Sequence, residues 1–127
     1  MRTRDIVGIS LSGACLVHCL ALPVLVSASP VLAWAEAEWV HVALALAALL
    51  VALAAMRRWP SGWLGAGLRG LALTGLTLLF YGALAEIGET FERWVTVIGA
   101  LALSAAHALA WGASAGAHRH AGTADDF

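Results

Sequence analysis

The chain has 127 residues, of which 61% are hydrophobic and 12% are charged. Soluble domains are typically about half apolar and a quarter charged, so this composition excludes an ordinary soluble domain and indicates a membrane protein. The formal net charge of −1 excludes a nucleic-acid binder that relies on a basic face. No GxxxxGK[ST] loop, no GxGxxG after a strand and no GxSxG elbow is recognised, so we predict that the protein is not an enzyme.

Four apolar stretches separated by charged residues predict an all-α, membrane-embedded bundle of four transmembrane helices, because about 20 apolar residues cross a bilayer. The helices are expected at about residues 6–28, 39–57, 64–85 and 93–113. We expect residues 1–117 to form one transmembrane domain and residues 118–127 to form a short polar cytoplasmic tail.

The N-terminal stretch has a second interpretation, a cleaved signal peptide. Two arginines precede it, and Ala33-Trp34-Ala35 fits an A-x-A cleavage site. However, the apolar region is longer than the roughly 7–15 residues of a signal-peptide core. We therefore expect it to be retained as the first span.

The positions of arginine predict the orientation of the bundle. Arg2 and Arg4 lie at the N-terminus, and Arg57, Arg58 and Arg69 lie near the middle connection. The other two connections are mainly acidic. The positive-inside rule therefore places both termini and the middle connection in the cytoplasm.

Arginine and tryptophan side chains near helix ends are expected at the membrane interface. Arg69 is expected to extend toward the lipid headgroups if it lies near the start of the third helix. The six tryptophans lie near predicted helix ends, as an aromatic belt would place them. They are Trp34, Trp39, Trp59, Trp63, Trp94 and Trp111.

The residues that carry chemistry are concentrated in the first predicted helix. Cys15, His18 and Cys19 fall on one arc of a helix at about 100° per residue. Two thiols and an imidazole suit thiophilic ions such as Hg(II), Cu(I) or Zn(II). Ionisable groups at this depth are costly unless they face the interior of the bundle. We predict a metal site, with simple packing of buried Cys and His as the alternative.

Three further residues could extend this site. His41 lies near the start of the second helix, Glu89 near the end of the third apolar stretch, and His107 within the fourth. The surrounding glutamates predict an acidic mouth that gathers cations. Histidines on three helices also suit a fixed metal or haem site, which is the main functional alternative to transport.

The sequence resembles the MerC family of bacterial inner-membrane mercury resistance proteins. The resemblance rests on the segment Ser12–Pro23, on Glu38-Trp39-Val40-His41, and on Glu86-Ile87-Gly88-Glu89 with His107. It covers nearly the whole chain. It implies a multi-pass protein of the inner membrane that takes up Hg(II), with Cys15 and Cys19 as the pair that receives the ion.

The chain departs from the family pattern in one respect. Members from mercury operons have a second cysteine pair toward the C-terminus, whereas this chain has two cysteines in total and carries His118 and His120 in its tail. Zn(II) or copper therefore remain alternative ions. Cytosolic thiols or a cytoplasmic metal acceptor are the expected partners, beside the lipid bilayer. A second copy of the chain, in a homo-oligomer, is an alternative partner.

Overall fold

The computed structural model describes residues 2–124. Within this range the side chains are described except at residues 2, 4, 5, 12, 15, 16, 18–20, 22, 23, 26, 27, 36 and 117–124. The described chain is helical apart from short connections and contains no strand in that range. Its elements are α1 (Arg2–Ala28), the 3-10 helix η1 (Pro30–Glu36), α2 (Glu38–Met56), α3 (Gly62–Leu84) and α4 (Glu89–Ala124).

The predicted all-α class is confirmed, and a helix lies at each predicted position. Three helices of the described part are long and apolar enough to cross a membrane: Glu38–Met56, Gly62–Leu84 and Glu89–Gly116 of α4. A membrane-spanning role for α1, and the side of the membrane on which the termini lie, stay predictions.

Two helical boundaries differ from the expectation. The connection after α1 is wound into η1, where Pro30 stands in the first turn with its fixed φ already suited to a helix. At the other end of the chain, α4 continues to Ala124 instead of ending near residue 113. Residues 114–124 contain four alanines, which favour a helix, and no proline to interrupt it, although Gly116 and Gly122 favour it less.

The two short connections turn at glycines. Gly62 follows Pro60 and Ser61 and has a φ of 87°, and Gly88 has a φ of 97° before α4 begins. Both values lie in the left-handed region that favours glycine. The side chain of Glu92 stabilises the second turn, because its Oε1 accepts a hydrogen bond from the backbone N–H of Ile87 at 3.2 Å.

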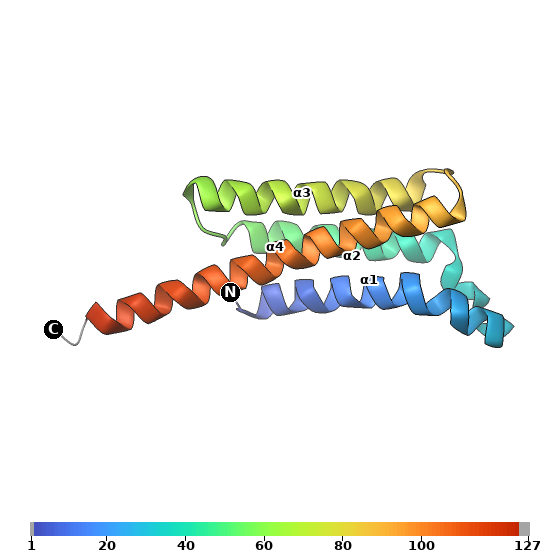
Figure 1. Cartoon of the computed structure of the whole chain (residues 1–127), viewed down its shortest axis with the longest axis horizontal. Helices are drawn as coiled ribbons and strands as arrows, with labels where there is room; N and C mark the ends of the chain where they lie inside the picture. Colours follow the sequence, from blue (N-terminus) through green and yellow to red (C-terminus); the bar gives the residue numbers. More distant parts are fainter. Residues whose placement is uncertain (1, 125–127) are drawn as a thin grey trace.

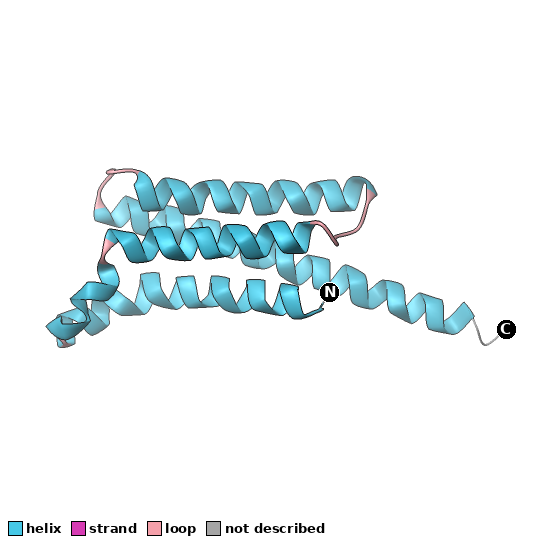
Figure 2. Ribbon diagram, turned by 180° about the vertical axis from the view of Figure 1, so that it is seen from behind, coloured by secondary structure: helices cyan, strands magenta, loops and turns pink. Residues whose placement is uncertain are grey.

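The helices pack as neighbours in a ring. The helix α1 contacts α2 and α4, and α3 contacts the same two helices, with the most extensive packing between α3 and α4. The two views in Figure 1 and Figure 2 show the helices running roughly side by side, with α4 extending beyond the others at its C-terminal end. The chain therefore reverses direction at each connection.

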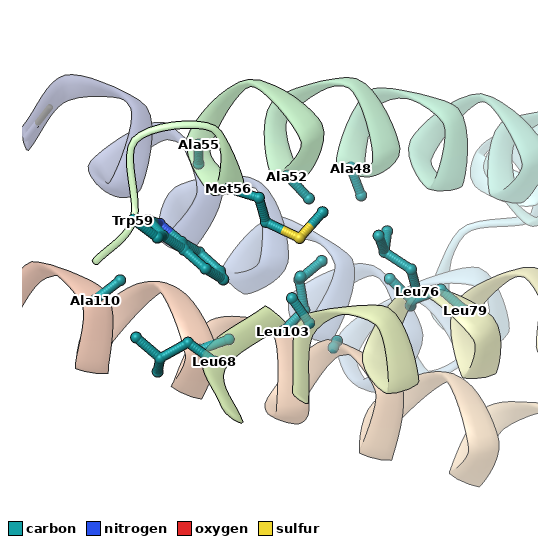
Figure 3. Packing of buried hydrophobic residues seen from close by; sticks show 13 residues of the cluster. Ala48, Ala52, Ala55, Met56, Trp59, Leu68, Leu76, Leu79, Leu103 and Ala110 are labelled. Carbon is teal, nitrogen blue, oxygen red and sulfur yellow. The ribbon is translucent and has the colours of Figure 1, made fainter. Parts of the chain in front are cut away.

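Small side chains make this packing close. The buried cluster combines alanines of α2, α3 and α4 with a few large apolar residues, as Figure 3 shows. Its members are Ala48, Ala52, Ala55, Met56, Trp59, Leu68, Ala72, Leu76, Leu79, Ala100, Leu103, Ala106 and Ala110. In a bilayer, where lipid is as apolar as leucine, such small residues let the helices approach and gain contact energy.

The two ends of the bundle carry different charges. One end, here called the basic end, holds the start of α1 and the α2–α3 connection (residues 57–61), with Arg57 and Arg58 exposed. The other, here called the acidic end, holds η1 and the α3–α4 connection (residues 85–88). Three glutamates are exposed there, Glu38, Glu86 and Glu89, together with one arginine, Arg93.

Candidate metal site

The cysteine-bearing segment lies inside a regular helix. Residues 15–19 belong to α1, so the backbone has the helical spacing that the site prediction requires. The side chains of Cys15, His18 and Cys19 lie outside the described part of the structure. The direction of their donor atoms therefore stays a prediction.

Among the predicted donors whose side chains the structure describes, His107 is the most deeply buried. Its side chain is 0% exposed on α4. The indole of Trp59 meets the imidazole edge to face, with ring centroids 5.4 Å apart and an angle of 81° between the planes. On another side the ring lies against α1, since a Cβ atom at Gly8 would stand 2.5 Å from Cε1 of His107. Three segments of the chain thus enclose this imidazole.

His41 is half-buried in the first turn of α2. Its Nδ1 lies 3.3 Å from the carbonyl oxygen of Ala37. A carbonyl can only accept a hydrogen bond, so Nδ1 is the donor in this contact, and in the neutral imidazole the lone pair is then on Nε2. That tautomer is the one in which an imidazole binds a metal through Nε2 while its other nitrogen is oriented by a backbone carbonyl.

Glu89 is exposed at the start of α4, near the acidic end. Glu92 differs from its neighbours, because its carboxylate is occupied by the N–H of Ile87. Carboxylates in the first turn of a helix also stabilise it by opposing the helix dipole. Glu92 is therefore a structural residue, whereas Glu89 is free to face solvent.

The described donors do not converge on one ion. Glu89 and His107 lie on the same helix, about 27 Å apart along its axis at 1.5 Å per residue. His41 lies near the acidic end and His107 toward the basic end. Among the residues whose side chains the structure describes, no group of three or more His, Cys, Asp or Glu is placed to hold a metal ion. A site that used all six predicted donors at once is therefore not formed.

The segment with the cysteines lies between these two histidines along the bundle. Gly8 marks the level of His107 on α1. Cys15 lies about 10 Å further along α1 toward the acidic end, from the helical rise of 1.5 Å per residue. The backbone thus orders the predicted donors along the bundle instead of clustering them.

The two tail histidines are placed less favourably for joint binding. Their side chains lie outside the described part of the structure, but α4 continues through His118 and His120. Residues two apart on a helix are turned by about 200° from each other. His118 and His120 of one chain therefore start on opposite faces of α4.

One interface prediction is wrong. Trp59 is 5% exposed and lies in the core, whereas the other tryptophans are exposed. Arg69 extends toward the basic end of the bundle, where its guanidinium donates hydrogen bonds to three backbone carbonyls, those of Met56, Trp59 and Pro60, at 3.1–3.2 Å. These carbonyls lie at the end of α2 and in the α2–α3 connection, where the helix leaves acceptors without helical partners.

Sequence reasoning missed the contacts of His107 with Gly8 and Trp59, and it missed the hydrogen bonds of Arg69 to the α2–α3 connection. A glycine in an apolar helix has many uses, and a proline after a tryptophan indicates only a turn.

Two glycine patterns in the sequence have the letters of enzyme motifs. Gly65–Gly70 reads GxGxxG within α3 and Gly112–Gly116 reads GxSxG within α4. Both lie inside helices, where the strand-to-helix turn of those motifs is not formed.

A comparison with protein families gave one match. The family model described as the MerC mercury resistance protein matches residues 5–112. The searches of curated proteins and of solved structures found no match. The matched range includes the Cys15–Cys19 segment, His41, Glu89 and His107, which are all the predicted donors.

Proposed function

This chain belongs to the MerC family of mercury resistance proteins, and on that premise we propose that it carries Hg(II) across a bacterial inner membrane. Uptake toward the cytoplasm is the proposed direction. The ion is the cargo of the protein, and Cys15 and Cys19 are its principal ligands, with His18 as a third donor.

One observation carries this proposal. The family match covers 5–112 and therefore includes the helix with both cysteines of the chain. Thiolates are soft ligands and select soft ions such as Hg(II) over Mg(II) or Ca(II). The position of the pair within α1, a helix that packs on α2 and α4, supports a site inside the bundle.

The order of donors along the bundle supports a relay. Glu89 and His41 at the acidic end receive the ion, the α1 thiols hold it, and His107 takes it toward the basic end. Because His107 and the level of Cys15 are about 10 Å apart along the helix axis, one ion does not bridge them. Conduction requires sites that also release the ion, so the thiols must exchange it to another donor.

The final acceptor in this scheme lies outside the chain. The sequence has two cysteines, so a second intramolecular thiol pair is absent. Cytosolic thiols or a cytoplasmic metal-binding protein supply the soft ligands that draw the ion from the basic end. A haem or metal site that joins His41 to His107 is not favoured, because the two lie toward opposite ends of the bundle.

Hg(II) uptake by cells that express the chain tests the proposal. Expression should increase the uptake of HgCl₂ and the sensitivity of cells that lack a mercuric reductase. Cys15→Ser and Cys19→Ser should each abolish the gain, because a hydroxyl is a poor ligand for a soft ion. His107→Ala should slow uptake without abolishing binding.

Val17→Ser is the matched control. Val17 lies between the two cysteines in sequence and is 65% exposed, so the same hydroxyl is introduced on the outside of α1. This variant should take up Hg(II) as the unmodified chain does. Normal uptake by the double variant Cys15→Ser, Cys19→Ser, at equal expression, would refute the proposal.

A further inference from the structure

We propose that Trp59 is a movable cover over His107, held closed by Arg69, and that the way from His107 to the basic end opens when the α2–α3 connection carries the indole away. Trp59 acts through His107 and is therefore a positioning residue. The inference rests on the proposed function only for the identity of the ion that leaves.

The first observation is the burial of His107 under a residue that belongs to no helix. The imidazole is 0% exposed, and Trp59, which is 5% exposed, lies edge to face against it at 5.4 Å. Trp59 is part of the α2–α3 connection (residues 57–61). Figure 3 shows its indole extending from this connection into the space near Ala110 of α4 and Leu68 of α3.

The second observation is that the other surroundings of His107 cannot yield easily. On the α1 side the neighbour is the backbone at Gly8, which is already in close contact with the ring. Eight residues before His107, α4 is also closely packed on α3, since a Cβ atom at Gly75 would stand 2.8 Å from the carbonyl oxygen of Gly99. Separating two helices would break contacts along much of their length. The five-residue α2–α3 connection can move without breaking the contacts between the helices.

The third observation is the way in which the connection is fastened. Arg69 Nη1 donates to the carbonyl of Pro60, and Nη2 donates to those of Met56 and Trp59, at 3.1–3.2 Å. Gly65 allows the connection to approach α3, because a Cβ atom there would collide with the carbonyl oxygen of Pro60. One guanidinium thus holds three backbone carbonyls between residues 56 and 60, and its release frees the segment that carries the indole.

The geometry also suits the exit of a soft ion. His107 is a single imidazole, which binds Hg(II) more weakly than two thiolates do. A weak last ligand under a removable cover lets the ion leave toward a stronger external acceptor and keeps water away from the ligand until then. Trp59 thus sets when the ion leaves, and the cysteines set which ion is taken.

Chemical modification of the native imidazoles by diethyl pyrocarbonate tests the cover without any metal. Peptide mass spectrometry of the full chain in membranes gives the modification rates of His107 and His41. In Trp59→Ala the rate at His107 should rise about tenfold, which corresponds to opening made easier by about 1.4 kcal/mol. Arg69→Gln should also raise the modification rate at His107. The indole remains in this variant, but the α2–α3 connection loses the hydrogen bonds that hold it in place. Trp59→Phe should restore most of the protection.

Trp63→Ala is the matched control, since Trp63 lies close in sequence but is 87% exposed and should leave the rate at His107 unchanged. His41, at the opposite end, reports general unfolding. If Trp59→Ala raises the modification rates at both histidines, the rate at His107 in Arg69→Gln decides between loss of the cover and general unfolding. Unchanged His107 modification in Arg69→Gln and Trp59→Ala, or an equal rise in Trp63→Ala, refutes the cover. A chain that takes up no Hg(II) refutes the transport proposal alone, because the modification is read without the ion.

Discussion

The imidazole of His107 lies against the backbone of α1 at Gly8, where a Cβ atom would stand 2.5 Å from the ring atom Cε1. Real side chains do not approach so closely, so a larger residue at this position must displace a fully buried ring or move the helix. Gly13, on the same helix, has no atom within 4 Å of an added Cβ. Gly8 therefore allows a close contact between α1 and His107, whereas Gly13 has open space at the position of an added Cβ.

Gly8→Ala should destabilise the protein by about 1–3 kcal/mol, the usual cost of an added methyl group in a packed core. Gly13→Ala should leave the stability unchanged or raise it by up to about 1 kcal/mol, because alanine favours the helix. Unfolding in mixed detergent, followed by far-UV circular dichroism, measures both. Equal effects of the two substitutions would contradict the contact between α1 and His107.

At the scale of the helices, the crossing of α3 and α4 holds the bundle together. Gly75 and Gly99 face each other across it, and each lies so that an added Cβ would stand 2.8 Å from the other's carbonyl oxygen. Further along the same interface, Gly82 faces the hydroxyl of Thr96, whose Oγ1 donates to the carbonyl of Glu92 at 2.8 Å. Small residues at these points allow the backbones to approach, as in other membrane helix pairs.

Gly75→Ala should destabilise the bundle by about 1–3 kcal/mol, because the added methyl group meets backbone atoms that cannot rotate away. Gly70→Ala is its control, since Gly70 lies on the same helix and has no neighbour within 4 Å. The same unfolding assay applies to both variants. A loss of stability in Gly70→Ala as large as in Gly75→Ala would mean that α3 does not pack on α4 through the Gly75 face.

At the scale of the whole molecule, charge separates the two ends. Arg57 and Arg58 are exposed at the basic end, and Glu38, Glu86 and Glu89 are exposed at the acidic end. Arg69 belongs to the basic end as well, although its guanidinium is bound to the α2–α3 connection. The positive-inside rule counts positions near the ends of spans, so the basic end is expected to face the cytoplasm.

Labelling of single cysteines from each side of the membrane tests this orientation. Ser61→Cys and Glu86→Cys, each in a chain with Cys15→Ser and Cys19→Ser, place one thiol in each short connection. An impermeant maleimide should label Ser61→Cys in inverted vesicles and Glu86→Cys in intact spheroplasts. The reverse pattern would contradict the cytoplasmic basic end and the proposed direction of uptake.

The sequence by itself determined the class of the protein, the positions of its helices, its family resemblance and the identities of the predicted donors. These properties follow from local patterns, because hydropathy and helical spacing are read from neighbouring residues. The sequence did not predict that α4 extends past residue 113, because the polar composition of the following residues indicated the end of the helix. The alanines of this segment favour a helix and α4 continues through it.

Only the tertiary structure decided that His41 and His107 lie apart, that Trp59 is in the core and that Arg69 binds the α2–α3 connection. The physical reason is that these facts depend on contacts between segments distant in the chain. A tryptophan or an arginine near a helix end has the same local sequence whether it faces lipid or a neighbouring helix. For Trp59 and Arg69 the deciding contact is the close approach of the α2–α3 connection to α3 at Gly65.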